Sequence, residues 1–241
     1  MSSASNDHDA AQGARLASAR LGEEHKALLR KILERQAYRQ LMLANIRGHG
    51  LKFLSEPADK IRLVRELEHG LQGLERVRRL YADIDGGDLA LAVRARMERI
   101  PYPNGMMELA ACLAICDLAE REAMEGYTDS ICGEFADIAH SVLGHDRGWT
   151  REGRELFVSF CADESQRPHA QQVFTRWVTI ALRSLGRPGT PGDRKAVALR
   201  LRSRGSAQAI APFLEHLEPF RQACGLAPPD LSETGLELPG A

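Results

Sequence analysis

Signals for β-strands are almost absent from this sequence of 241 residues. It has no sustained alternation of apolar and polar residues, and no Asn-Gly or Asp-Gly turn between β-branched runs. Apolar residues recur instead with helical spacing along most of the chain. These patterns exclude a sheet protein and predict an all-α fold.

Three further absences restrict the function. The formal net charge is −1, without the excess of Lys and Arg that a dedicated nucleic-acid surface usually has. No apolar run approaches the roughly 18–20 residues that cross a bilayer, and the N-terminus lacks the apolar core of a secretory signal. We therefore expect a cytoplasmic protein that binds neither nucleic acid nor membrane.

The cysteines are few and unpaired in sequence. The chain has five, an odd number, and none forms a Cys-x-x-Cys motif. Cys112 and Cys116 lie one helical turn apart in an apolar stretch. The favoured interpretation is reduced thiols in the core of a cytosolic protein, and a metal or redox role is the alternative.

Apolar periodicity and breaks at Gly, Pro and Asp place the expected helices. We expect residues 1–14 to be a disordered tail, 15–230 to form one helical domain, and 231–241 to be a flexible tail. The expected helices span residues 14–49, 57–81, 89–100, 106–130, 133–161 and 168–186, followed by two short ones. Four long helices with extra C-terminal helices predict an elaborated four-helix bundle.

Acidic and histidine side chains occur at corresponding positions of the four long helices. A di-iron bundle takes one carboxylate from each of two helices and a Glu-x-x-His pair from each of the others. The first two helices offer Glu34 and the pair Glu66 and His69, and a separation of 32 residues suits similar heights in an antiparallel hairpin. The other two offer Asp117, within an apolar run, and His145.

One expected ligand is missing from this set. The second bridging carboxylate belongs three residues before His145, where the sequence has Val142. Two substitutes are open: the Asp137 and His140 pair in a shifted register, and Glu120 one turn from Asp117. Asp146 lies about 100° around the helix from His145 and is not expected to point inward.

Several segments together resemble a known family. They are "RELEHGLQGLERVRRLY", "IPYPNGMMELAACLAICDLA", "HSVLGHDRG", "VFTRWVTIALRSLGRPG" and the C-terminal "RSRGSAQAIAPFLEHLEPFRQACGLAPPD". In this order and spacing, over residues 25–231, the chain is similar to the phenylacetic acid catabolic protein family. That family contains the catalytic subunit of the multicomponent phenylacetyl-CoA epoxidase, which has a ferritin-like four-helix fold.

The resemblance implies a ferritin-like monooxygenase with a di-iron centre. Its metal ligands would be Glu34, Glu66, His69, Asp117 and His145, with Glu66 and Asp117 at the reacting centre. Iron would activate O2 with electrons from an external reductase, and the substrate would be an aromatic or acyl-CoA thioester. The chain would work in a homo- or hetero-oligomer, with a second ferritin-like subunit as one partner.

Two other functions stay open. The family also includes a non-catalytic partner subunit that keeps the fold and has lost metal ligands. Because Val142 replaces a glutamate, this chain could be such a metal-free pseudo-enzyme, with its polar cluster kept as a buried hydrogen-bonded network. The third interpretation is a plain helical scaffold in which the spacing of these residues is coincidental.

Overall fold

The computed structural model describes residues 15–145 and 148–231. All regular elements within these ranges are helical, so the prediction of an all-α fold is confirmed there. The α-helices are α1 (Glu23–Gly50), α2 (Pro57–Asp83), α3 (Leu89–Met97), α4 (Met106–Glu125), α5 (Gly133–Leu143), α6 (Gly148–Ala162), α7 (Arg167–Leu185), α8 (Pro191–Ala198) and α9 (Ser206–Ala223). Two short 3₁₀ helices, Ser18–Arg20 and Leu51–Phe53, precede and follow α1.

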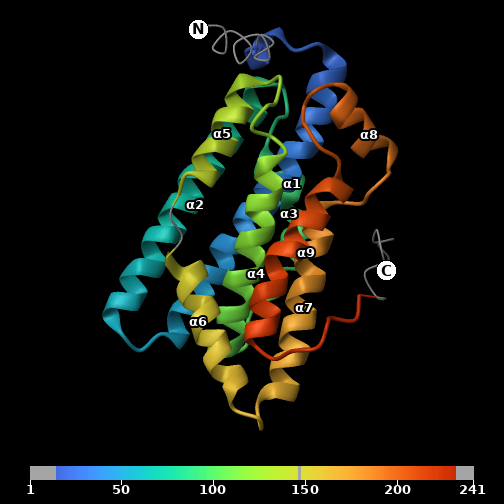
Figure 1. Cartoon of the computed structure of the whole chain (residues 1–241). Coiled ribbons are helices and arrows are strands. Elements are labelled where there is room, and N and C mark those ends of the chain that lie inside the picture. Colours follow the sequence, from blue (N-terminus) through green and yellow to red (C-terminus); the bar gives the residue numbers. More distant parts are fainter. Residues whose placement is uncertain (1–14, 146–147, 232–241) are drawn as a thin grey trace, which may run out of the picture.

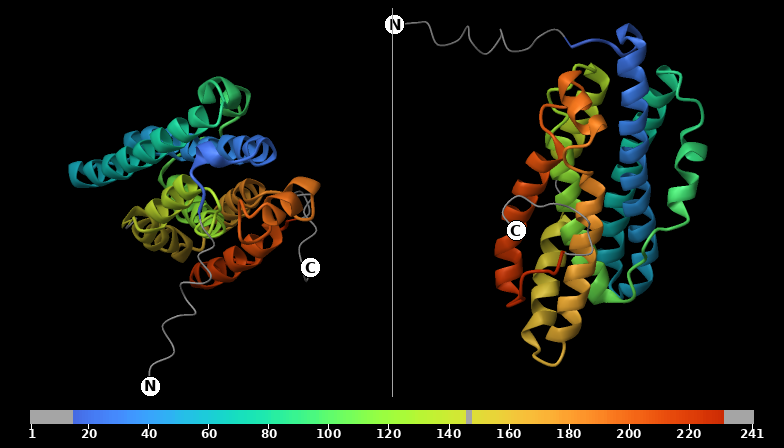
Figure 2. Two further views of the ribbon diagram at one scale, coloured as in Figure 1. Left: turned by 90° about the horizontal axis from the view of Figure 1, so that it is seen from above. Right: turned by 90° about the vertical axis from the view of Figure 1, so that its right-hand side faces the viewer.

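Helix α4 lies at the centre of the molecule (Figure 1). It packs against α1, α5, α6, α7 and α9. Seen end-on, α1 and α2 form one layer, α4 lies in a second layer between α5–α6 and α7, and α9 covers that layer from outside (Figure 2). Because α4 is surrounded, its sequence is apolar on all sides and nearly all its side chains are buried.

Glycine allows one close approach in this centre. A Cβ atom at Gly153 of α6 would lie 3.0 Å from the carbonyl oxygen of Ala110 of α4. Such a distance is tighter than ordinary van der Waals contact, so the missing side chain lets α6 pack directly on the α4 backbone.

The fourth long helix differs from the prediction. One helix over 133–161 was expected, and the structure has two, α5 and α6. Helix α5 ends at Gly144, whose backbone N–H donates to the carbonyl oxygen of His140 at 2.9 Å. Glycine at positions 144 and 148 disfavours a continuous helix, because glycine has low helix propensity.

The cysteines are buried, as predicted. All five cysteines are free and buried, and the sulfur atoms of Cys112 and Cys116 are 4.0 Å apart. Apart from residue 231, the tails expected at 1–14 and 231–241 lie outside the described residues. Within the described ranges, no helix is both long enough and apolar enough to cross a membrane.

Candidate functional site

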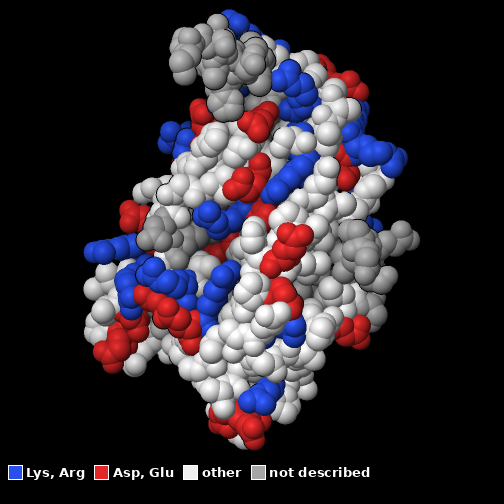
Figure 3. Space-filling view, viewed as in Figure 1, with Lys and Arg blue, Asp and Glu red and all other residues white. Residues whose placement is uncertain are grey.

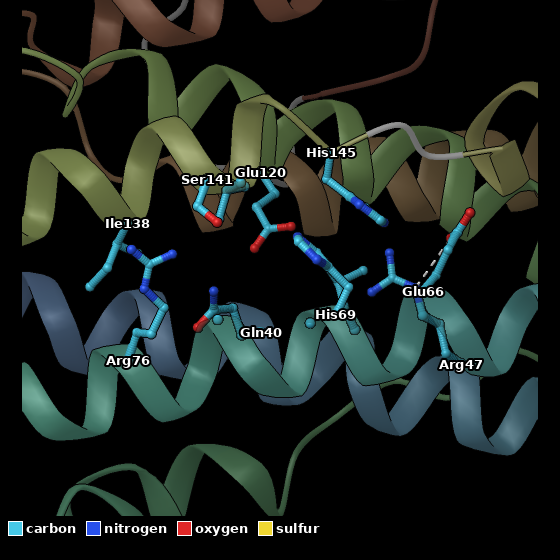
Figure 4. A pocket seen from close by; sticks show the side chains of 13 residues that line it. Gln40, Arg47, Glu66, His69, Arg76, Glu120, Ile138, Ser141 and His145 are labelled. Atoms are coloured by element: carbon cyan, nitrogen blue, oxygen red, sulfur yellow. Dashed lines mark ion pairs between the residues drawn. The ribbon is translucent and has the colours of Figure 1, made fainter.

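A small cavity lies between α1, α2, α4 and α5, with a volume of about 20 Å³ (Figure 4). That volume is enough for about one water molecule. Side chains reach it at helical spacing: Gln40, Leu43 and Arg47 from α1, Glu66, His69 and Arg76 from α2, Glu120 from α4, and Ser141, Val142 and His145 from the α5 segment. The cavity is therefore lined mainly by polar side chains.

Glycine on α2 makes room for one of these polar groups. A Cβ atom at Gly73 would lie 3.0 Å from the Nε2 atom of Gln40. Without that side chain, α1 and α2 approach closely enough for Gln40 to occupy the space between them. Gly73 thus serves helix packing beside the cavity.

Two histidines meet at the cavity. The rings of His69, on α2, and His145, directly after α5, stack with centroids 3.6 Å apart and planes 8° from parallel. Figure 4 shows them pointing toward one another across the space between the two helices. The structure therefore brings together the two imidazoles that the sequence proposed as metal ligands.

Arg47 lies between two of the proposed carboxylate ligands. Its Nη2 atom is 2.6 Å from Oδ1 of Asp117, and its Nε atom is 3.7 Å from Oε2 of Glu66. The hydroxyl of Thr150 donates to Oδ2 of Asp117 at 2.9 Å. The side chains of Arg47, Glu66 and Asp117 are only 5%, 8% and 0% exposed. A buried guanidinium thus supplies the positive charge beside these two carboxylates.

Glu120 belongs to a second buried network. Its Oε1 atom accepts a hydrogen bond from Nε2 of Gln36 at 3.2 Å. The Oε1 atom of Gln36 accepts from Nη2 and Nε of Arg39 at 2.6 and 3.0 Å. Burial lowers the pKa of Arg39 from its usual value, and the nearby Tyr127 and Glu120 oppose that change. The carboxylate considered as a substitute ligand is therefore tied to α1 by hydrogen bonds.

Glu34 lies apart from the other proposed ligands. Its Oε1 atom accepts a hydrogen bond from the Tyr81 hydroxyl at 3.0 Å, and its Oε2 atom is 4.0 Å from Nη2 of Arg96. The turn between α1 and α2 follows residue 50, so Glu66 faces Arg47 rather than Glu34. Thirteen helical residues separate positions 34 and 47, or about 20 Å along α1. The expected match in height between Glu34 and Glu66 was wrong for this reason.

Asp137 and His140 do not reach the cavity either. Asp137 has a side chain 65% exposed and pairs with Arg15 at 3.7 Å, and His140 is also exposed. Val142 is buried among apolar side chains, where the glutamate of a di-iron site would stand. Asp146 lies outside the described residues.

Sequence reasoning missed the most informative residue of the site. Arg47 lies on the face of α1 that also carries Leu43, and a charged residue on such a face is an available signal. The spacing of 32 residues instead pairs Glu66 with Glu34, so it does not point to Arg47. Gln40 and Arg76 also line the cavity and were not predicted.

The carboxylates at this cavity already have polar partners in the structure. Arg47 contacts both Glu66 and Asp117, so α1 contributes a cation in place of a carboxylate. Thr150 also donates to Asp117, and Gln36 donates to Glu120. In the part of the chain that the structure describes, no group of three or more His, Cys, Asp or Glu side chains is placed to hold a metal ion. No protein-family model matches the chain, and no curated protein matches it.

Proposed function

We propose that this protein is a ferritin-like partner subunit of a multicomponent oxygenase of the phenylacetic acid catabolic type, and that it works without a metal. One observation carries the proposal: the guanidinium of Arg47 lies between Asp117 and Glu66, where an active subunit would need a metal cation. The buried ion pair then holds together the helices that a di-iron centre would otherwise join.

Charge supports this proposal. A carboxylate as deeply buried as Asp117 is costly unless a cation or hydrogen-bond donors accompany it, and Arg47 and Thr150 fulfil that requirement. A metal ion bound by the same carboxylate would lie close to the guanidinium. Two like unit charges about 4 Å apart repel by about 4 kcal/mol at an effective dielectric constant of about 20. The arginine therefore opposes metal binding.

Shape supports it as well. The cavity holds about 20 Å³, and the apolar Val142 forms part of its wall. That space accommodates about one water molecule. In a partner subunit this centre would have a structural role, and the function would reside in the outer surfaces that contact the catalytic subunit.

A gain of metal binding tests the proposal. The double variant Arg47→Glu/Val142→Glu removes the cation and adds carboxylates on α1 and α5. We expect the wild-type chain to take up no stoichiometric iron in an anaerobic ferrous titration, and the double variant to bind it. The matched control is Glu34→Gln, which changes a carboxylate away from the cavity. Stoichiometric iron in the wild-type protein would refute the metal-free function.

A second candidate is the iron-dependent monooxygenase itself. It is favoured by the convergence of Glu66, His69, Glu120 and His145 on one cavity, because carboxylates and imidazoles suit iron. Bound iron would supply oxygen activation, with electrons from an external reductase and a CoA thioester as substrate. Arg47 would first have to leave its carboxylate partners. On this alternative, His69→Ala abolishes iron binding and Arg47→Gln strengthens it.

A further inference from the structure

Arginine side chains gather around a groove on the opposite side of α1 from the cavity. The groove has a volume of about 520 Å³ and is formed by α1, α3, the segment after α3, and α7. Figure 2 (right) shows α1 between α3 and α7. Its basic residues come from all of these segments: Arg35, Arg39, Arg96, Arg99 and Arg183.

The positive charge of Arg35, Arg96 and Arg99 in this groove is poorly compensated. None of the described residues that line it is acidic. Within the described ranges, the side chains of Arg35 and Arg99 make no hydrogen bond or ion pair, and Arg96 is 4.0 Å from Glu34, which already accepts from Tyr81. Like charges around one concavity repel each other, so a bound anion would stabilise the arrangement.

One arginine is held in place beforehand. Arg39 is 3% exposed, and its guanidinium donates to Oε1 of Gln36 and, at 3.0 Å, to the carbonyl oxygen of Ser184. A side chain fixed in this way loses little conformational entropy when a ligand binds. Arg39 therefore provides a rigid base for the more exposed arginines.

The remaining lining is apolar or aromatic. Met42, Pro101, Ile180 and the ring of Tyr38 lie among the arginines. A guanidinium group can donate two parallel hydrogen bonds to phosphate oxygens. Apolar and aromatic side chains can pack against the flat or hydrophobic part of the same ligand. A volume of about 520 Å³ falls within the usual range for small-molecule sites.

We propose that this groove binds a phosphorylated organic molecule of nucleotide size, with its phosphates on Arg35 and Arg99 and its apolar body against Tyr38 and Ile180. The site is separate from the histidine cavity and does not depend on whether that cavity holds metal. A nucleic acid is disfavoured because the net charge of the chain is −1. On the face drawn in Figure 3, moreover, basic and acidic side chains are interspersed.

Calorimetric titration of the full chain tests the site, with ADP, pyrophosphate and adenosine as probes. We expect ADP to bind most tightly, pyrophosphate more weakly, and adenosine not measurably. The double variant Arg35→Gln/Arg99→Gln should weaken ADP binding by about a hundredfold or more, since each lost charge-assisted bond lowers affinity by roughly tenfold or more. The variant should fold normally, because neither side chain has a partner within the described residues.

The matched control is Arg65→Gln/Arg94→Gln, which removes the same charge from exposed positions outside the groove. It should leave ADP binding unchanged. The proposal is overturned if the wild-type protein binds neither ADP nor pyrophosphate at millimolar concentration, or if both double variants weaken binding equally. Tighter binding of a single-stranded oligonucleotide than of ADP would also overturn it and indicate a nucleic-acid surface.

Discussion

Replacing Arg47 by methionine should strongly destabilise the protein. Methionine keeps much of the apolar stem but removes the guanidinium, leaving the carboxylates of Asp117 and Glu66 buried without their shared cation. Removing one partner of a buried ion pair typically costs about 3–5 kcal/mol. Because Asp117 is 0% exposed and its contact with Arg47 is 2.6 Å, the loss should fall within that range.

A double-mutant cycle identifies the cause of this loss. Asp117→Leu removes the carboxylate, and Arg47→Met/Asp117→Leu removes the whole contact. We expect the double variant to be more stable than the sum of the single effects predicts, by about 2 kcal/mol. The assay is urea unfolding followed by circular dichroism at neutral pH, with a chelator present so that metal does not contribute.

An exposed pair provides the comparison. Arg78 pairs with Glu75 at 2.6 Å on the surface of α2, where solvent screens the charges. Arg78→Met should therefore leave the unfolding midpoint nearly unchanged. If Arg47→Met also left the unfolding midpoint nearly unchanged, Arg47 would not be an essential part of the buried network. The proposed replacement of metal by arginine would then be refuted.

Three other properties of the chain can be checked independently. Gly153→Ala should cost about 1–3 kcal/mol in urea unfolding, because the new Cβ would lie 3.0 Å from the carbonyl oxygen of Ala110; no loss would contradict the α4–α6 packing. Burial raises the pKa of Cys132 to about 12, and all five cysteines are buried, so iodoacetamide at pH 8 should label the native protein slowly and the unfolded protein fully. Although burial pushes the pKa of Glu134 up, hydrogen bonds from the backbone and hydroxyl of Ser18 bring it below its usual 4.5. Its stabilising effect should therefore be complete above pH 4.5 and be lost as the pH falls through the lowered pKa. A smaller protection factor of the Ser18 amide against hydrogen exchange in acid, relative to the intrinsic rate at the same pH, would show this loss.

The helices could be predicted because apolar spacing and glycine or proline breaks are local signals. Helix α4 was evident from the run "LAACLAICDLA", whose apolar character on every side indicates a central helix. The break between α5 and α6 was missed, because apolar periodicity continues across it and outweighed Gly144 and Gly148 in the interpretation. Helix pairing in space depends on packing between distant segments, which spacing alone does not give.

The residues of the candidate site could be predicted only in part. Glu66 and His69 share one face of α2 by helical geometry, so their common location could be predicted. The partner on α1 required the register of the hairpin, and an error of about 13 residues exchanged Arg47 for Glu34. A cation therefore lies where a carboxylate was expected. This difference in charge is the basis for proposing a metal-free subunit in place of a di-iron oxygenase.

Iron content per chain tests the central claim most directly. The wild-type protein would be produced with added iron, purified without chelator and analysed for elements, with circular dichroism to show that it is folded. A metal-free partner subunit should contain iron well below one ion per chain and should keep its unfolding midpoint after treatment with a chelator. About two iron ions per chain, as in ferritin-like di-iron proteins, would contradict the account and establish the oxygenase alternative.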